Sequence, residues 1–118
     1  MYSSNPDLEL KFNSREIFSI MLALQTIIKI PSADPDLLKI MKIIHPQLTT
    51  SDEQLVKINL YDSVTLLAEL LIFNDKYLHS SFLNNICVNI ADVIVAFVAD
   101  EFYDELKLQN LLRSAGIK

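Results

Sequence analysis

Few side chains in this sequence are of the types that hold metal ions or act as nucleophiles. The chain has two histidines, His45 and His79, and a single cysteine, Cys87. Asp75 and His79 stand four residues apart, which could place both on one face of a helix. A metal site in a helical bundle needs a second pair, normally a glutamate followed three residues later by a histidine, and the sequence has none. We therefore expect no metal site, and a structural or solvated role for each histidine.

Cys87 lies in an apolar stretch typical of a helix, and we expect it to pack as a small hydrophobic residue. As a nucleophile it would need His45 or His79 beside it in the fold, and no local signature indicates this. The only glycine is Gly116, so the sequence has no glycine-rich loop of the kind that binds phosphates. These features predict a protein that is not an enzyme and uses no cofactor.

The densest group of charges is acidic and includes two aromatic residues, Phe102 and Tyr103. One interpretation is the solvated first turn of a helix, because acids favour the positive end of the helix dipole. The other is a docking patch for a basic protein, with Tyr103 as its aromatic anchor. The second interpretation predicts a partner-binding site made of Asp100, Glu101, Tyr103, Asp104 and Glu105.

Two further groups of residues are candidates for a binding surface. Asn85, Asn89 and Asp92 fall on one stripe of an otherwise apolar helix, which is either a polar groove or the solvent-facing side. A second group lies slightly off the main apolar stripes of the predicted helices: Ile20, Leu60 and Ile72. If these three are exposed, they form a patch that favours a partner or self-association. If the helices pack on more than one side, these three residues are buried in the core instead.

Length and composition indicate one helical domain. The chain has 118 residues, of which 51% are hydrophobic, so it can build a single core. One glycine and four prolines are few for the many tight turns of a β-sandwich or barrel. A single cysteine cannot form an internal disulfide, which argues against a small secreted scaffold held together by disulfides.

The net charge of −5 bears on partners and location. Nucleic acids and anionic membranes are bound through lysine and arginine, and this sequence has no basic cluster, so we expect neither as a partner. A basic protein, or a second copy in a homodimer, is the expected partner. Residues 1–11 do not resemble a signal peptide, and the longest unbroken apolar run, 93–99, is far shorter than the ~20 residues of a membrane helix. The expected location is the cytoplasm.

The beginning of the chain changes from an extended to a helical pattern. Residues 1–12 are predicted to form an extended arm, because apolar and polar residues alternate from Leu8 to Phe12. One short strand cannot make a sheet, so the arm should lie on the helices or pair with another copy. A first helix is predicted to begin at Asn13, where Glu16 completes a capping box, and to end before Pro31.

The rest of the chain predicts a helix over 34–45, where Asp34 is the N-cap, and another over 50–74, where Glu53 follows Thr50 at capping-box spacing. A bend at Asn59, which would divide this helix into two pieces, is the alternative. A further helix is predicted from Ser80 or Ser81 onward. A single helix over 81–114 would be ~50 Å long, too long for a compact domain, so we expect a break near Ala99 and Asp100. A buried strand over 93–98 is the competing interpretation. No internal repeat is apparent. The predicted fold is all-α: a compact bundle of about five helices with a short N-terminal extended arm, in one domain spanning residues 1–118.

These observations favour a small acidic protein-binding domain. An immunity or inhibitor-type protein that neutralises a basic toxin or nuclease would fit the acidity, the size and the lack of recognisable chemistry. The alternative is a structural or regulatory subunit or adaptor, acting as a homodimer or within a larger assembly. An enzyme that uses an unrecognised carboxylate site is the least favoured class.

Overall fold

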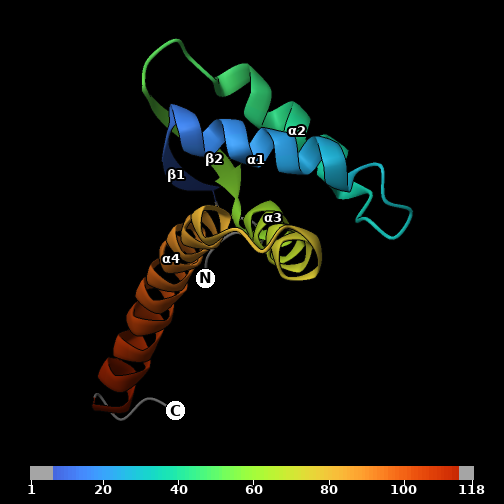
Figure 1. Ribbon diagram of the computed structural model, residues 1–118. Coiled ribbons are helices and arrows are strands. Elements are labelled where there is room, and N and C mark those ends of the chain that lie inside the picture. The colour runs from blue at the N-terminus through green and yellow to red at the C-terminus, as the bar shows by residue number, and fades with distance from the viewer. Residues whose placement is uncertain (1–6, 115–118) are drawn as a thin grey trace.

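The structure, a computed structural model, describes residues 7–114, with the backbone but not the side chains of residues 101–112 and 114. Its described part is mainly helical and includes a small sheet (Figure 1). The elements are β1 (Asp7–Asn13), α1 (Ser14–Ile27), α2 (Asp36–Ile44), β2 (Glu53–Asn59), α3 (Leu60–Phe73) and α4 (Ser81–Ser114). The mainly helical character is confirmed. The all-α class is not confirmed, because two strands pair, and the described residues form four α-helices where about five were expected, since two of the expected helices are one.

The sheet consists of β1 and β2, which pair antiparallel with Leu10 opposite Val56 at the centre of the ladder. Buried and exposed side chains alternate along both strands, so one face of the sheet packs on the core and the other faces solvent. On the outer face, Lys11 forms an ion pair of 3.2 Å with Glu53 of the other strand. The extended backbone predicted for the arm is confirmed over residues 7–12, and residues 1–6 of the arm lie outside the described residues. Its partner is not the helices alone but a second strand from the middle of the chain.

The prediction of a helix beginning at Thr50 is wrong, because residues 53–59 form β2 and α3 begins at Leu60. The buried positions of this segment have the two-residue period of a strand: Gln54, Val56 and Ile58. Gln54 is buried although it is polar, and its side chain is satisfied locally. Its carbonyl oxygen accepts the N–H of Thr49 at 2.8 Å, and its amide donates to the C=O of Thr49 at 3.1 Å.

The caps predicted at Asn13 and Ser80 are confirmed, whereas no helix begins at Thr50, and the N-cap of α2 is Pro35 and not Asp34. Asn13 Oδ1 accepts the N–H of Glu16 at 2.8 Å, and Glu16 Oε1 accepts the N–H of Asn13 at 2.9 Å, so the capping box is complete. Asp34 Oδ1 accepts the N–H of Asp36 at 2.8 Å at the start of α2. Ser80 Oγ accepts the N–H of Leu83 at 3.2 Å at the start of α4.

The chain contains a structural repeat, because β1, α1 and α2 are followed in the same order by β2, α3 and the first turns of α4. One constant offset takes Asn13, the N-cap of α1, to Asn59, the N-cap of α3. The same offset takes the buried residues of α2, which are Leu37, Ile40 and Ile44, to those of α4, which are Leu83, Ile86 and Ile90. The expectation of no internal repeat is wrong. Counterparts elsewhere share burial but seldom identity, as with Phe12 and Ile58.

The repeat gives the sheet a local two-fold axis. Its offset takes Leu10 to Val56, and these two residues face each other at the centre of the ladder. The packing of the helices follows the same symmetry: α1 and α3 lie against both strands and against each other, while α2 lies against β2 and α4 against β1. The buried residues of both halves form one hydrophobic core.

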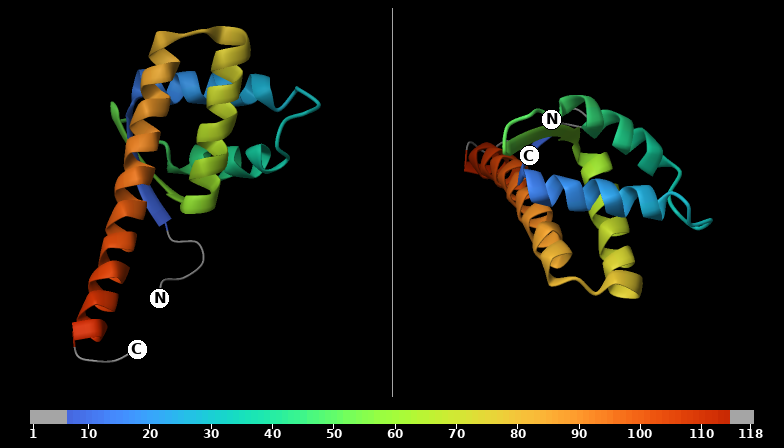
Figure 2. Two further views of the ribbon diagram at one scale, coloured as in Figure 1. Left: turned by 90° about the horizontal axis from the view of Figure 1, so that it is seen from below. Right: turned by 45° about the horizontal axis from the view of Figure 1, so that its top comes forward.

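A sharp reversal joins α3 to α4 and makes them neighbours (Figures 1 and 2). His79 adopts a left-handed backbone with φ of 51°, an uncommon conformation for a residue other than glycine. The buried side chain of Asn74 holds this turn, since it accepts the N–H of Ser80 at 2.7 Å and donates to the C=O of Ser80 at 3.0 Å. The two helices therefore form an antiparallel pair.

Helix α4 is continuous, so the break expected near Ala99 and Asp100 is absent. Its 34 residues correspond to about 50 Å, and the longest dimension of the molecule is 56 Å. Figure 2 shows why the helix need not break, since beyond its packed beginning α4 continues past the rest of the fold. A compact domain limits the length of a helix only over the part that packs against other elements. The counterpart helix α2 ends at Ile44.

We expect that a chain ending after Asp100 keeps its fold. In the first half of the repeat, α2 occupies the position of α4 and ends at Ile44. The residue of α4 that corresponds to Ile44 is Ile90, so the repeated fold needs α4 only to about this residue. The free energy of unfolding, measured by urea denaturation, should fall by no more than about 1 kcal/mol. As a comparison, Ile86→Ala in the full chain should cost about 2–5 kcal/mol. A shortened chain as unstable as that variant would contradict the prediction.

Candidate functional site

The residues tested for metal binding and catalysis do not come together. His45 and His79 are both exposed, and Asp75 is exposed near His79 at the end of α3. Among the described residues, no three side chains of His, Cys, Asp or Glu are grouped so that they could hold a metal ion. The structural or solvated role predicted for the histidines agrees with these positions.

Cys87 is buried on the core side of α4, as the sequence predicted. Burial raises the pKa of its thiol from 9.0 to about 11, because a thiolate loses its hydration inside the core. A nucleophilic cysteine needs the opposite shift. Cys87 therefore serves packing, at the position that corresponds to Met41 of α2.

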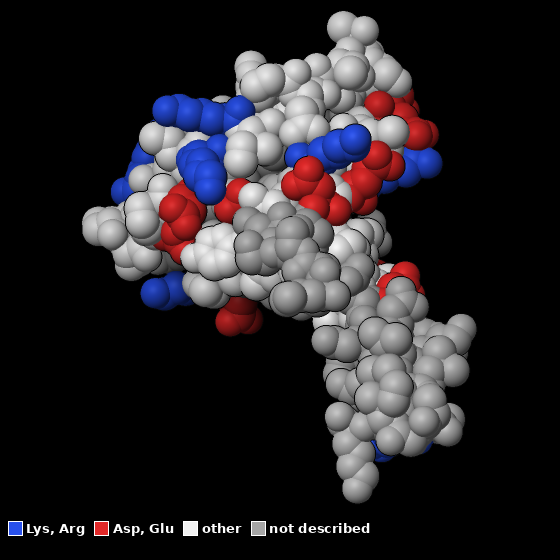
Figure 3. Space-filling model, turned by 180° about the vertical axis from the view of Figure 1, so that it is seen from behind, with Lys and Arg blue, Asp and Glu red and all other residues white. Residues whose placement is uncertain are grey.

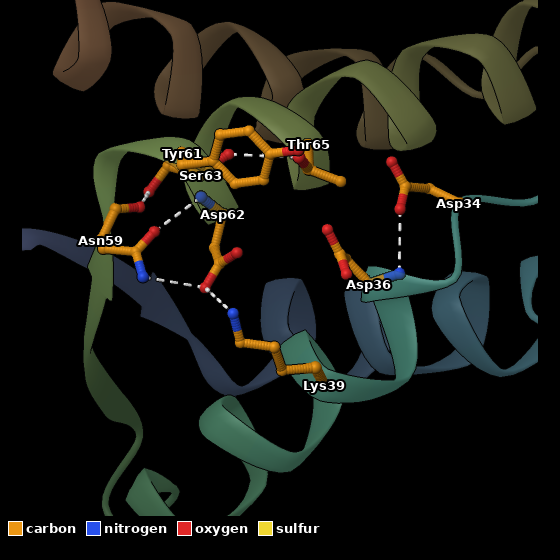
Figure 4. A network of polar contacts seen from close by, with 8 residues as sticks. All are labelled: Asp34, Asp36, Lys39, Asn59, Tyr61, Asp62, Ser63 and Thr65. Atoms are coloured by element: carbon orange, nitrogen blue, oxygen red, sulfur yellow. Dashed lines mark hydrogen bonds and ion pairs between the residues drawn. The ribbon is translucent and has the colours of Figure 1, made fainter. Parts of the chain in front are cut away.

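The most buried ionisable side chain among the described residues is Asp62, in the first turn of α3 (Figure 4). Asp62 is 0% exposed, and one of its carboxylate oxygens, Oδ2, accepts the side-chain amide of Asn59 at 2.9 Å and lies 3.8 Å from Lys39 Nζ. Its other oxygen, Oδ1, has no hydrogen-bond partner. Asp62 corresponds in the repeat to Glu16, whose longer side chain completes the cap of α1 at the surface.

The surroundings of Asp62 indicate a structural role. Lys39 belongs to α2, so its ion pair with Asp62 ties α2 to α3 (Figure 4). A second link joins the segment just before α2 to α3, because the N–H of Asp34 donates to Glu69 Oε1 at 3.1 Å. The Lys39 side chain is 62% exposed, so water screens its charge and the pair contributes little by itself. Without a second titratable partner at the buried oxygen, the network positions helices and carries no evident acid–base chemistry.

The predicted acidic site lies mostly outside the described side chains. Asp100 is exposed on α4, while the side chains of Glu101, Tyr103, Asp104 and Glu105 are outside the described residues. Their role as a partner-binding site stays a prediction. The backbone there continues α4, so these acids do not begin a new helix, and the helix-start explanation for them is wrong.

The polar stripe Asn85, Asn89 and Asp92 is exposed along α4 and turned away from the core. This agrees with the simpler interpretation, a solvent-facing side. Of the three apolar residues off the main stripes, Ile20 is fully buried in the core, Leu60 is half-buried and Ile72 is exposed. These three therefore do not form one patch.

The feature that the sequence analysis missed is the outer side of α4. Residues 93–99 are all apolar, so this part of the helix is apolar around its whole circumference. The core contacts one side of it through Val93 and Ile94, which are only partly buried. Val95 is 65% exposed, and Val88 and Val98 are also exposed. The run of seven apolar residues was the available signal, and its meaning depended on how little of the helix the fold covers.

The exposed side of α3 continues this apolar surface. Val64 and Leu71 are exposed on α3, one heptad apart, as Val88 and Val95 are on α4. Leu71 and Asn84 line the same shallow hollow, which shows that the outer sides of the two helices adjoin there. We define the apolar face as Val88, Val95 and Val98 of α4 together with Val64 and Leu71 of α3.

Part of α4 also resembles a membrane span. By length and composition alone, Ser81–Asp100 could cross a bilayer. Three residues of this segment, Leu83, Ile86 and Ile90, are however fully buried in the core of the domain. A spanning helix would have to leave that core, which would expose the apolar surface that these residues cover. The absence of a membrane partner stays a prediction.

Charge is mixed over the rest of the surface. On the face drawn in Figure 3, basic and acidic side chains are interspersed over the body of the domain, without a large area of one sign. Between Ser81 and Asp100 the sequence has only two charged residues, Asp92 and Asp100, and both are acidic and exposed. The charges beside the apolar face on α4 are therefore all negative.

We expect Asp62→Ala to destabilise the protein more than its repeat counterpart Glu16→Ala. Loss of the buried Asp62 carboxylate leaves the Asn59 amide without its partner and should cost about 1–3 kcal/mol. Glu16 is half-buried, so water can replace the hydrogen bond that its carboxylate makes to the N–H of Asn13. Removal of the Glu16 side chain should therefore cost less than about 1 kcal/mol. Lys39→Met should also cost less than about 1 kcal/mol. Urea denaturation measures all three, and equal costs for Asp62 and Glu16 would refute a special role for the buried carboxylate.

The buried thiol should make stability depend on pH in the alkaline range. Because the folded state raises the pKa of Cys87 from 9.0 to about 11, it holds the proton more tightly than the unfolded state. This contribution is complete below pH 9 and is lost as the pH rises toward 11. Wild type should therefore lose more unfolding free energy between pH 8 and pH 10.5 than Cys87→Ala, which controls for lysine and tyrosine titration. Parallel pH profiles would show that the thiol is not buried as described.

No family model, curated protein or solved structure matches this chain. The function proposed below therefore rests on the residues, contacts and charges of the chain itself.

Proposed function

We propose that this chain is a protein-binding domain and that the apolar face on α3 and α4 is its docking surface. The observation that carries the proposal is the helical segment 93–99, which is apolar all round and covered by the core on one side only. A helix with apolar residues on every side is normally buried. A partner that covers Val95 and Val98 would complete its burial.

The structural repeat supports a role for α4 beyond folding. In the first half, α2 completes its share of the core with nine residues and ends. The part of α4 that corresponds to α2 ends near Ile90, and the exposed residues Val95 and Val98 follow it. These residues are an addition to the repeated unit, so a function other than core packing accounts for them best.

Two forms of protein binding use this surface. An inhibitor-type protein would occupy the surface of a basic toxin or nuclease, which suits the net charge of −5. A subunit or adaptor would cover the same apolar face with a second copy or with another component of an assembly. In both forms a protein contacts Val95, and the forms differ in the identity of that protein.

Site-specific photo-cross-linking in the native cell tests the proposal. We expect a photoreactive phenylalanine analogue at position 95 to form a discrete adduct with a protein, because the side chain there would lie in the interface. The mass of the adduct identifies the form: twice the mass of the chain indicates a homodimer, and any other mass indicates a different partner.

The matched control is the same analogue at position 38. Leu38 is an exposed residue of α2, outside the apolar face, and no adduct is expected there. Adducts at both positions would indicate non-specific contacts, and adducts at neither would refute the docking surface.

A further inference from the structure

The structural repeat shows that the fold itself does not require the apolar face. Each residue of α3 has a counterpart in α1, and the early residues of α4 have counterparts in α2. Leu71 corresponds to Gln25 and Val88 to Lys42, and all four side chains are exposed. Only the counterpart of Val64 is also apolar. Since polar residues suit two of these positions in the first half, a contact outside the domain accounts best for the apolar ones in the second half.

The apolar face carries almost no charge. On α3, Asp62 is buried and Glu69 is turned toward the N–H of Asp34, so neither carboxylate lies on this face. On α4, Asp92 adjoins the face, whereas the helical spacing turns Asp100 away from it. Interfaces between identical subunits are more apolar than those of other complexes, and the centres of interfaces are poor in charge. The face therefore suits a second copy better than a partner recognised by its charge.

The size of the apolar face is also sufficient for a dimer. Its five residues are between 42% and 65% exposed. This amounts to roughly 400 Å² of apolar surface, which is the size of the patches through which proteins bind partners. A standard interface buries about 800 Å² on each partner, of which somewhat more than half is apolar. The face therefore supplies most of the apolar surface that each copy contributes to a dimer.

Asp92 determines the direction in which two copies can pair. Identical copies associate most often about a two-fold axis. In a parallel pairing of two α4 helices, Asp92 would face Asp92 of the other copy. In an antiparallel pairing centred on Val95, each Asp92 lies opposite Val98 of the other copy, and the two carboxylates are offset by six residues, about 9 Å along the axis. Figure 2 shows that α4 continues past the rest of the fold, which leaves it accessible to a second helix.

We infer that the occupant of the apolar face is a second copy of this chain, and that the two α4 helices pair antiparallel about a two-fold axis near Val95. Val88 and Val98 lie on either side of this axis, and the exposed residues of α3 lie beside the contact. This inference rests on the proposed function, since it identifies the partner of the same surface. Burial of the valines supplies the affinity, and the antiparallel direction keeps the two Asp92 carboxylates apart.

Sedimentation equilibrium of the full-length chain tests for the dimer. We expect a monomer–dimer equilibrium with a dissociation constant between about 1 and 300 μM. Val95→Asn should weaken the dimer at least about tenfold, because it places an amide in the apolar contact. Leu38→Asn is the matched control, since Leu38 is exposed on α2 and its counterpart in the repeat is already an asparagine, Asn84. Thermal unfolding followed by circular dichroism confirms that both variants are folded. A chain that stays monomeric over this range would overturn the inference.

Oxidative cross-linking tests the position of the two-fold axis. Val95→Cys should form a disulfide between two copies, because the axis brings the two residues at its centre together. Val88→Cys is the matched control, since its two copies would be offset by fourteen residues, about 21 Å along the helix axis. Wild type controls for Cys87, which is buried. If Val88→Cys cross-links as efficiently as Val95→Cys, the antiparallel arrangement is wrong.

Two further outcomes would identify a different occupant. If the chain is monomeric but the photoreactive group at position 95 still forms an adduct with another protein in the cell, the docking surface stands and the second copy is wrong. Flotation with vesicles of neutral phosphatidylcholine detects a lipid surface as the occupant. Vesicle binding by a monomeric chain that Val95→Asn abolishes would overturn the inference in favour of lipid. The absence of a dimer, an adduct and vesicle binding would overturn the docking surface itself.

Discussion

The pairing of β1 with β2 is the constraint on which the rest of the structure depends. Two strands alone are at most marginally stable in water, and here they come from distant parts of the chain, which adds the entropy of closing a long loop. The pairing persists because one face of the sheet is buried by α1 and α3. Each half therefore needs the other, since neither strand has another strand to pair with among the described residues.

The two halves use the same plan but differ where polar groups enter the interior. In the first half the cap partner is Glu16 at the surface, and in the second it is the fully buried Asp62, whose charge is held by Asn59 and by Lys39 of α2. Burying a carboxylate is costly unless it is paired and hydrogen-bonded. The asymmetry ties α3 to α2, while on the other side Arg15 of α1 stacks on the ring of Phe82 of α4 at 5.4 Å.

The larger difference is the length of the final helix in each half. α2 ends where its core contacts end, whereas α4 continues as an uninterrupted helix of which the core uses only the beginning. A large contiguous apolar surface that a core leaves exposed indicates an interface, because single exposed apolar residues are common but extended apolar patches are rare.

The sequence by itself determined the local structure. The caps at Asn13 and Ser80 could be predicted because a side chain within three residues satisfies the first N–H groups of a helix. The extended backbone of β1 and the burial of Cys87 followed equally from local pattern. The secondary structure of residues 53–59 could not be predicted in the same way, because a short segment with Leu, Val and Ile is compatible with a helix or a strand until its partner is known.

Only the tertiary structure decided the non-local features. β2 became a strand because β1 lies beside it, and the repeat emerged from shared burial since few counterparts are identical. The continuity of α4 and the exposure of Val95 depend on where the core ends. The apolar run 93–99 was visible in the sequence, but sequence alone could not distinguish a buried helix from an uncovered one. That distinction depends on which other elements reach the helix, because burial is a property of the packed chain and not of the segment.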